Sequence, residues 1–441
     1  MCSVIEEFKM CYDNLMKQSV IRIIQVVVAI VVIVLFVYVN GYEKHYGPEA
    51  IKHYGHIDLT VFYVAGTTIT GSSYFSSHHI YNQKLFQPLI ERYHPVGTGK
   101  HFLYPPSAAI FFAPLAKFSL DDVGKYWATS NAVLFVLTYL FMILFLLKDR
   151  RWYKFRYSIV LLAVTFSHPV ISQFATGQIN VVIWFLLMLF VLFFSKNRQL
   201  LSGGVLAIAM MTKIFPVMFA LPLLLHKKWL ALVSLMLTSL VIFWVTFKWF
   251  KFEDWWFFIS ERFPKIAGGE IAVKHASKSI YGTYRGIVHA GYFEQFGFTK
   301  EQFIDLTNIL QIIFTLGMAV TLIAFTIYIS KKVTKETATH YAIITYSVYM
   351  VMFLVFSKIV LLHYLIWTIP VYLFLLWKKP IYKHVIYNIS IGLSLWLVFY
   401  GHGLNTILLH SIKPTTLGLM ILLVLVAFAV GDPNLASKQT K

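Results

Sequence analysis

Apolar runs long enough to cross a membrane recur along most of the chain. A helix needs about 20 predominantly apolar residues to cross the hydrocarbon core of a bilayer. The first such run covers about residues 19–38, and the second covers about residues 128–147. Further membrane helices are predicted at roughly 157–174, 178–194, 229–249, 308–330, 340–356, 360–377, 383–400 and 414–431. The pattern predicts an all-α, polytopic transmembrane protein with about 11 to 13 membrane helices.

The composition also indicates a membrane protein, and the charge indicates which binding partners to expect. Of 441 residues, 58% are hydrophobic and only 13% are charged, whereas soluble proteins carry about 25% charged residues. The net charge of +19 would suggest nucleic acid in a soluble chain. Here the basic residues stand mostly in short loops between apolar runs, where they set orientation and meet anionic lipid headgroups. Membrane lipids are therefore expected partners, and nucleic acid is not.

The basic loops predict which side of the membrane each segment faces. Lys148, Arg150, Arg151, Lys154 and Arg156 follow the second run and give the strongest cytoplasmic signal. This orientation places segments 40–127 and 250–307 on the extracytoplasmic side. The predicted organisation is a cytoplasmic segment over 1–18, one transmembrane domain over 19–431, and a cytoplasmic tail over 432–441.

One apolar segment fits this orientation only as a hairpin. Basic loops flank residues 202–225 at both ends, Lys196 with Arg198 before it and Lys227 with Lys228 after it. A broken helical hairpin that leaves and returns on the same side would keep both loops in the cytoplasm and carry Lys213 toward the far side. The alternative is an ordinary kinked span with one basic loop misread.

Asp58 is an acid at the start of an apolar, helical run in the first outer segment. Aspartate is a preferred helix N-cap, and its charge suits the positive end of the helix dipole. The functional interpretation is a general base, which needs a carboxylate near the proton that it removes. The sequence alone leaves both interpretations open.

Polar residues near the predicted outer turns are further candidates. Tyr104 opens a Tyr-Pro-Pro motif before the short apolar piece 107–118, which is too short to span and predicts an interfacial or re-entrant helix. Gln178 and Asn180 stand where one span ends outside and the next begins, so they either cap the returning helix or bind a hydroxyl-rich ligand.

Basic residues in apolar surroundings suggest an anionic ligand group. Lys213 stands near the middle of an apolar segment, which is costly and marks a functional-site hypothesis unless the side chain snorkels to an interface. Lys278, Ser279 and Arg285 belong to a basic, hydroxyl-rich patch that either holds a phosphate or polyol or forms a solvated loop face. His363 follows about one and a half helical turns after a predicted outer turn, and it is either a hydrogen-bonded core histidine or part of the site.

Metal and cofactor signatures are missing from the sequence. His53, His56, Asp58, His78 and His79 share one outer segment, but their spacing matches no metal site. No HExxH, CxxC, P-loop or dinucleotide fingerprint occurs. Neither a metal nor a cofactor is expected.

In order along the chain, these motifs resemble glycosyltransferase family 87, polytopic enzymes of the GT-C class. The matching segments are Asp58, Tyr63 to Gly66, Tyr104 to Pro106, Pro114 to Ala116, Trp127, Gly177 to Asn180, Lys213 to Pro216, Ser277 to Gly282, and Ser357 with His363. Ser277 and Lys278 stand where the family usually has Asn and Gln.

The resemblance implies a GT-C fold and an inverting transferase that uses a polyprenyl-phosphate-sugar donor. It makes Asp58 the expected catalytic base and places the substrate near Tyr63, Tyr104, Gln178, Asn180, Lys213, Lys278, Ser279, Arg285 and His363. Mannose is the first expected sugar and arabinofuranose the second, with a glycolipid or glycan of the cell envelope as acceptor. The expected location is the plasma membrane, with the site on the extracytoplasmic side.

Two other classes compete with a transferase. A transporter or lipid flippase predicts inverted repeats with polar residues paired at the midplane, and the sequence shows no such symmetry. A non-catalytic assembly subunit is also compatible with the pattern, although an inactive relative is expected to have lost the acid that stands here at Asp58.

Overall fold

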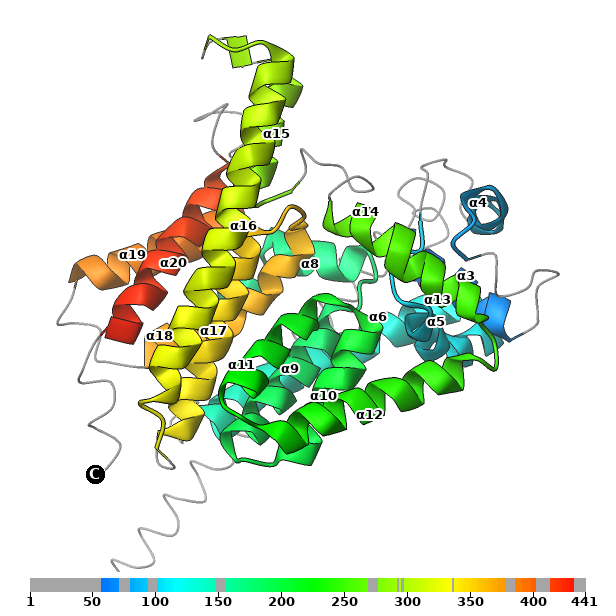
Figure 1. Ribbon diagram of the computed structural model, residues 1–441, viewed down its shortest axis with the longest axis horizontal. Coiled ribbons are helices and arrows are strands. Elements are labelled where there is room, and N and C mark those ends of the chain that lie inside the picture. Colours follow the sequence, from blue (N-terminus) through cyan, green and yellow to red (C-terminus); the bar gives the residue numbers. More distant parts are fainter. Residues whose placement is uncertain are drawn as a thin grey trace, which may run out of the picture.

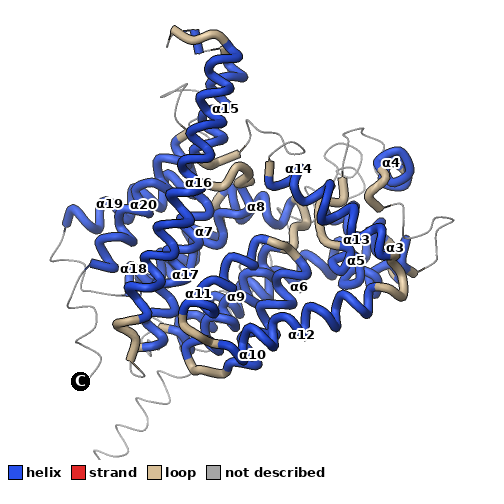
Figure 2. The backbone as a smooth tube through the Cα atoms, viewed as in Figure 1, coloured by secondary structure: helices blue, strands red, loops and turns tan. Residues whose placement is uncertain are grey.

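The computed structural model describes residues 57–70, 80–93, 101–147, 155–268, 277–291, 293–294, 297–334, 337–377, 385–401 and 413–431. Every regular element within these ranges is a helix, so the predicted all-α class is confirmed (Figure 2). Four described helices are long and apolar enough to cross a membrane, or five spans if one bent pair counts as a single span. The chain is a polytopic integral membrane protein. The predicted first span and the basic residues over 148–154 lie outside the described residues.

The first part of the chain forms several short helices and one helix long enough to span a membrane. Their bounds are α3 Ile57–Ile69, α4 Gln83–Glu91, α5 Pro106–Phe112, the 3-10 helix η3 Ala113–Lys117, α6 Leu120–Phe141 and the π-helical turn η4 Met142–Leu146. The short helix expected within 107–118 is confirmed as α5 and η3. α6 begins eight residues before the predicted span because Ser119 caps it and accepts from the Asp122 amide. Its first two turns are polar but helical.

The middle part contains two breaks that position the site. Its helices are α7 Phe155–Thr165, α8 His168–Ala175, α9 Asn180–Ser195, α10 Gln199–Thr212, η5 Phe215–Phe219, α11 Ala220–Leu225 and α12 Trp229–Thr246. The single span predicted over 157–174 is wrong, since the helix stops at Thr165 and resumes at His168, with Pro169 in its first turn. α8 and α9 then meet at 112°, and Gly177 supplies the left-handed backbone of this bend with φ of 65°.

The hairpin predicted over 202–225 is present. α10 runs back along α9, the chain reverses at Lys213 and Ile214, and η5 with α11 returns (Figure 1). The Lys228 Nζ donates to the Asn197 Oδ1 at 2.7 Å, so the two flanking basic loops lie together. Lys213 lies at the opposite end, beside Asn180.

The last part builds the segment between α12 and α16 and the central bundle. Its elements are α13 Phe252–Phe257, the π-helical turn η6 Phe258–Arg262, α14 Phe263–Ala267, α15 Ile280–Ala290, α16 Lys300–Ser330, α17 Ala338–Phe356, η9 Leu362–Thr368, α18 Ile369–Trp377, α19 Val385–Tyr400 and α20 Pro414–Gly431. α17 is buried along most of its length and packs against α9, α16 and α20 (Figure 1). α12 and α16 instead expose apolar side chains, including Trp244 at 75% and Val320 at 66%. These two helices present the faces that suit a hydrocarbon environment.

Close packing of α10 on α12 depends on one glycine. A Cβ added at Gly203 would stand 2.0 Å from the Ala231 carbonyl oxygen and 2.9 Å from the Leu235 amide nitrogen. We expect Gly203→Ala to lower the stability of the detergent-solubilised protein by about 1–3 kcal/mol, because the backbones must move apart. Thermal unfolding measures this loss.

The neighbouring glycine is a matched control. A Cβ at Gly204 would meet only side-chain oxygens at 3.6 and 3.8 Å, which are ordinary contacts. Gly204→Ala should be neutral or stabilising by up to about 1 kcal/mol from helix propensity. An equal loss of stability in both variants would contradict the packing explanation.

Candidate active site

Asp58 lies in the first turn of α3, where its carboxylate bonds to another element. The Asp58 Oδ2 accepts from the Gln178 Nε2 at 2.6 Å. The backbone also joins the two elements, since the Leu59 amide donates to the Thr176 carbonyl at 3.2 Å. The side chain is half-buried. The acid is therefore held in place against the α8–α9 bend by residues about 120 positions away.

Gln178 is held on both sides of its amide. While its Nε2 donates to Asp58, its Oε1 accepts from the Tyr104 hydroxyl at 3.0 Å. The Gln173 Nε2 donates to the Gln178 carbonyl oxygen at 2.5 Å, and the Trp127 Nε1 donates to the Gly177 carbonyl at 2.9 Å. These contacts fix the bend that aims Gln178 at the acid.

The Tyr104 phenol also interacts electrostatically with the Asp58 carboxylate. Burial raises the pKa of the Tyr104 phenol well above its ordinary value, and the nearby charge of Asp58 raises it further. The phenol therefore stays protonated and remains a donor to Gln178.

Lys213 reaches the same site from the tip of the hairpin. Its Nζ donates to the Asn180 Oδ1 at 2.7 Å, and the Asn180 Nδ2 donates to the Gln173 Oε1 at 2.9 Å. Lys213 is 8% exposed and lies over the Tyr364 ring, 4.1 Å from its centroid. The side chain is therefore enclosed by polar and aromatic groups of the protein. Asn180 and Gln178 do not cap α9 with their side chains.

His363 and its neighbours form the wall on the other side of Lys213. His363 is 5% exposed within η9, which packs against α8. Its Nε2 is buried and has no hydrogen-bond partner among the described residues. The rings of Tyr364 and Trp367 stack at 4.8 Å, and the Trp367 Nε1 donates to the Asn180 carbonyl at 3.1 Å. This wall is aromatic, with one unsatisfied imidazole nitrogen.

A second basic cluster adjoins this wall. The Lys278 amide donates to the Val360 carbonyl at 2.7 Å, and the Val360 amide donates to the Ser277 Oγ at 2.9 Å. Ser279 caps α15 through the Gly282 amide. A Cβ at Gly282 would stand 2.2 Å from the Ser277 carbonyl oxygen, so only glycine lets this loop pack on the helix. The Lys278 patch and the His363 wall are thus tied by the loop before η9.

Lys413 is the cation of this cluster that the sequence did not indicate. Its Nζ donates to the carbonyls of Ser277 at 2.7 Å and Gly282 at 3.1 Å. Burial lowers the pKa of Lys278 to about 8. Burial, and then the charge of Lys278, lowers the pKa of Lys413 to about 7. Because the two lysines are buried close together, each holds its proton less tightly than an exposed lysine does.

These lowered pKa values predict a dependence of stability on pH. An unfolded lysine binds its proton up to about pH 10.4, so the unfolded state binds more protons than the folded state above about pH 7. Stability should therefore rise as the pH rises from about 7 to 10. In Lys413→Met the rise should be smaller. Thermal unfolding across this pH range compares the slopes, and identical slopes in parent and variant would contradict the assignment.

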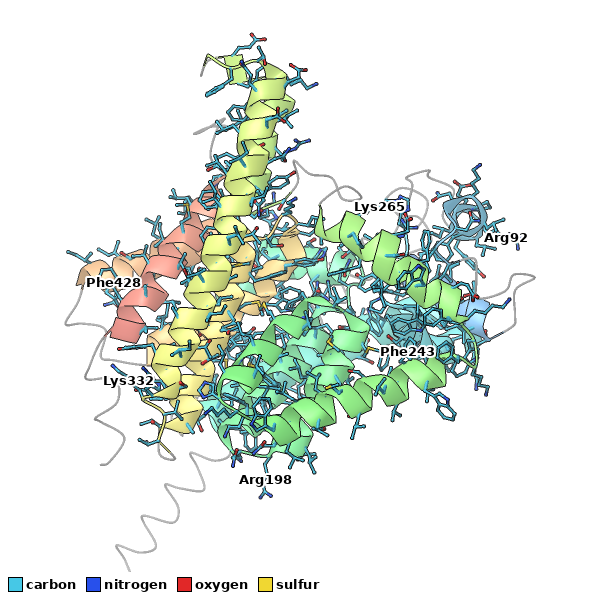
Figure 3. The ribbon with its side chains drawn as sticks, in the orientation of Figure 1. Arg92, Arg198, Phe243, Lys265, Lys332 and Phe428 are labelled. Atoms are coloured by element: carbon cyan, nitrogen blue, oxygen red, sulfur yellow. The ribbon has the colours of Figure 1, made fainter. Side chains whose placement is uncertain are left out.

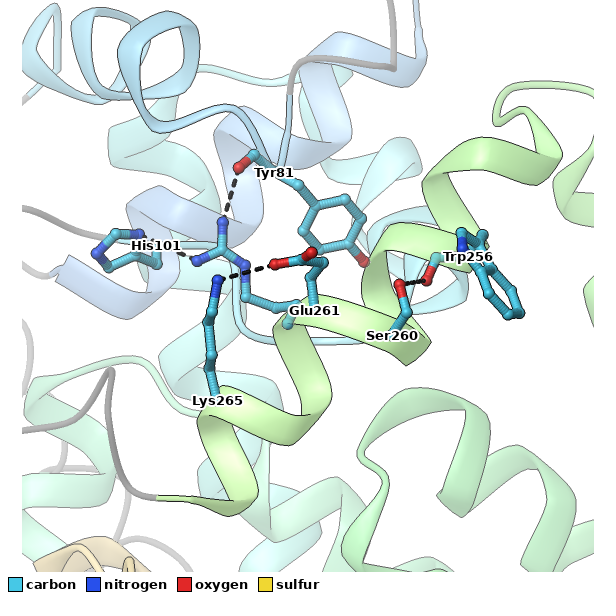
Figure 4. A network of polar contacts seen from close by, with 7 residues as sticks. Tyr81, His101, Trp256, Ser260, Glu261 and Lys265 are labelled. Carbon is cyan, nitrogen blue, oxygen red and sulfur yellow. Dashed lines mark hydrogen bonds and ion pairs between the residues drawn. The ribbon is translucent and has the colours of Figure 1, made fainter.

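Arg262, the last residue of η6, connects the segment after α12 to Tyr81 and His101, which Figure 4 labels. Its Nη2 donates to the Tyr81 carbonyl at 2.7 Å, and its Nη1 lies 3.5 Å from the His101 Nδ1. The Tyr81 hydroxyl donates to the Tyr104 carbonyl at 2.6 Å. Burial, and then the charge of Arg262, lowers the pKa of His101. The chain Arg262, Tyr81, Tyr104 therefore supports the residue that holds Gln178.

Two predicted residues lie apart from these contacts. Tyr63 donates to the Phe118 carbonyl at 2.9 Å and packs with Leu59 and Val123. Arg285 is half-buried on α15 and makes no hydrogen bond or ion pair with a described residue. The structure does not bring either side chain to Asp58.

The structure adds residues that sequence reasoning missed. They are Gln173, Tyr364, Trp367 and Lys413. Tyr364 and Trp367 follow His363 closely, and Gln173 precedes the Gly-Gln-Ile-Asn segment. Their closeness in sequence to predicted site residues was the signal that could have identified these three. Within the described ranges no three His, Cys, Asp or Glu side chains gather as metal ligands, while His53, His56, His78 and His79 lie outside those ranges.

Comparison with known proteins supports one family. The sequence model of glycosyltransferase family 87 matches residues 102–357, more than half of the chain. No curated protein and no solved structure matches the chain. The match includes Tyr104, Gln178 and Lys213 but begins after Asp58 and ends before His363. With this match and an all-α membrane architecture, the chain belongs to glycosyltransferase family 87 and is a membrane glycosyltransferase.

Proposed function

We propose that this glycosyltransferase moves a sugar, mannose first, from polyprenyl phosphate to a glycolipid or glycan acceptor, with inversion at the anomeric carbon. The proposed site faces the extracytoplasmic side of the plasma membrane. The observation that carries the proposal is the pairing of a fixed acid with a buried cation. Asp58 and Lys213 each bond to one end of the Gln178 to Asn180 turn. An acid and a cation so placed suit proton removal and anion stabilisation in one reaction.

Asp58 is the proposed general base. Its carboxylate accepts the proton of the acceptor hydroxyl as that oxygen attacks C1 of the sugar. The bond from C1 to the phosphate oxygen breaks on the opposite face, and polyprenyl phosphate leaves with the electron pair. Gln178 donates to the Asp58 Oδ2 and so orients the carboxylate toward the acceptor hydroxyl in this proposal.

The leaving phosphate needs positive charge, for which the structure offers two groups. Lys213 lies against Asn180 and the Tyr364 ring, close to the acid. Lys278 lies in the second cluster with Lys413, and its amide bonds to Val360 in the loop that leads to His363. An inverting reaction places base and leaving group on opposite faces of the sugar. We therefore propose Lys278 with Lys413 for the phosphate, and Lys213 for the sugar and for the field around Asp58.

A lipid donor fits the apolar surface beside the site. The segment after α12 exposes Phe252 at 59%, Trp256 at 60% and Ile259 at 52%. These positions are spaced four and three residues apart, so they share one helical face. Aromatic side chains of this kind are typical of the membrane interface. Such a face would lie along the polyprenyl chain while the sugar phosphate enters the site.

Release of polyprenyl phosphate tests the proposed function directly. The full chain in nanodiscs is incubated with polyprenyl-phosphate-mannose and a panel of glycolipid acceptors, and the freed lipid phosphate and the glycosylated product are measured together. We expect acceptor-dependent release in equal amounts with product. If neither a mannose nor an arabinofuranose donor reacts, the donor assignment fails. Movement of the intact donor across the bilayer without transfer would instead indicate a flippase.

A further inference from the structure

A cavity of about 540 Å³ lies at the end of the bundle away from Asp58. It is lined by the α9–α10 turn, the α11–α12 turn and the start of α17 with the end of α16. α9 begins at Asn180 in the active site and ends at Ser195 on the cavity. Its 16 residues separate the two regions by about 24 Å. The cavity is therefore distinct from the proposed glycosyl-transfer site.

The polar part of the lining is basic and hydroxyl-rich. Lys196 and Lys228 line it from two different turns, together with Ser195 and Thr339. None of the described residues that line it is acidic. The Lys228 Nζ bonds to the Asn197 Oδ1, and Asn197 and Lys227 have left-handed backbones with φ of 55° and 54°. Two tight turns thus hold the positive charges at the same mouth. Arg198 directly precedes α10 in the first of these turns, at the lower edge of the molecule in Figure 3.

An unsatisfied imidazole lies in the same wall. His226 lines the cavity, and its Nε2 is buried without a hydrogen-bond partner among the described residues. Burial, and then the charge of Lys228, lowers the pKa of His226. Buried polar atoms normally have a partner. A ligand oxygen near this ring would supply one.

The apolar part of the lining distinguishes a lipid from a free anion. Phe194, Ile329 and Val333 line the cavity beside the lysines. It opens next to α16, whose outer side exposes Leu316 at 62% and Val320 at 66% toward the proposed hydrocarbon. A volume of this size lies in the range of whole small-ligand sites, about 300–1,000 Å³. A mixed basic and apolar pocket beside a lipid-facing helix suits a headgroup with the start of its acyl chains.

We propose that this cavity binds the phosphate-bearing headgroup of an anionic membrane lipid. Basic pockets between membrane helices are suited to such headgroups because each lysine near the surface attracts negative lipid. The bound lipid joins the turns before α10 and α12 to the connection between α16 and α17. It therefore braces the hairpin whose tip carries Lys213.

Native mass spectrometry of the full chain tests this proposal with two lipids of identical acyl chains. We expect one phosphatidylglycerol to be retained with about tenfold preference over phosphatidylcholine. Lys196→Gln with Lys228→Gln should remove the preference. Lys84→Gln with Lys300→Gln changes the net charge equally at exposed positions outside the cavity and should keep it.

A second variant fills the cavity without changing its charge. Ala338 lines the cavity at the start of α17, so Ala338→Trp should also remove retention, with unchanged helix content and elution volume as the check on folding. Retention in Ala338→Trp, or equal loss in the control pair, would overturn the proposal. Displacement of the lipid by inorganic phosphate at equal concentration would show a free-anion site and would overturn the lipid assignment. Sugar transfer is assayed separately, so failure here leaves the proposed enzyme function standing.

Discussion

Replacing Asp58 with asparagine is expected to lower the rate of polyprenyl phosphate release by about 10² to 10⁴. The change keeps the size of the side chain and its position beside Gln178, whose Nε2 donates to the Asp58 Oδ2, but it removes the proton acceptor. The loss should fall on kcat, because the base acts on the acceptor hydroxyl in the transition state and not on the donor in the ground state. Initial rates at saturating donor measure it.

Asp121→Asn is the matched control for this variant. Asp121 is an exposed acid in the first turn of α6, and its replacement removes the same charge from the outer segment. Its rate should stay within about twofold of the parent, since exposed charges contribute little. If Asp58→Asn retains the parental rate within about tenfold, the base assignment fails.

Lys213→Met is expected to lower transfer by about 10² to 10³, the loss typical when one preorganised electrostatic group is removed. Methionine fills a similar volume beside the Tyr364 and Trp367 rings, but it leaves the Asn180 Oδ1 without its 2.7 Å donor. The electrostatic field around Asp58 then changes, and Asn180 at the start of α9 loses a hydrogen bond. Steady-state kinetics in nanodiscs, beside thermal unfolding, separates lost chemistry from lost folding.

Lys213→Arg gives the second measurement for this position. It restores the charge but not the compact ammonium that fits between Asn180 and Tyr364, so partial recovery of kcat over Lys213→Met is expected. Lys300→Met, at an exposed position at the start of α16, serves as the control. If Lys213 only supports folding, each variant should lose activity in proportion to the fall in its melting temperature. Lys213→Arg should then recover no more activity than its melting temperature accounts for.

The membrane helices could be predicted closely because hydropathy reports directly on the spans. The elements over 180–195, 229–246 and 385–400 fall within a few residues of the expected ranges. Hydropathy does not report where a helix begins in water, so the polar starts of α6 at Leu120 and α16 at Lys300 were missed. The hairpin was predictable from charge, since basic loops on both sides favoured a segment that leaves and returns on the same side over a kinked span.

The site was predictable where a polar residue was out of place in an apolar chain. Asp58, Gln178, Asn180 and Lys213 stand out for that reason, and the structure brings them into one network. Trp367 did not stand out, because tryptophan is ordinary in such a chain and only packing places its ring near Lys213. Which cations adjoin one another also depends on packing.

Tyr63 shows where motif proximity misleads. It stands five residues after Asp58 on the same helix, so the two side chains point about 140° apart. One faces the bend at Gln178, and the other faces Phe118. The nearby Gly66 has a packing reason, since a Cβ there would stand 2.6 Å from the Phe112 carbonyl oxygen.

The hairpin that carries Lys213 has a consequence for how the protein is made. α10 has 14 residues, and η5 with α11 spans only 11 more, so neither half reaches the length at which a helix is stable alone across a bilayer. We therefore expect the two halves to enter the membrane together during synthesis, held by α9 and α12, which flank them in sequence. The α9 contact also places Lys213 beside Asn180. Insertion of this hairpin and completion of the Lys213 to Asn180 pair are therefore one event in biogenesis.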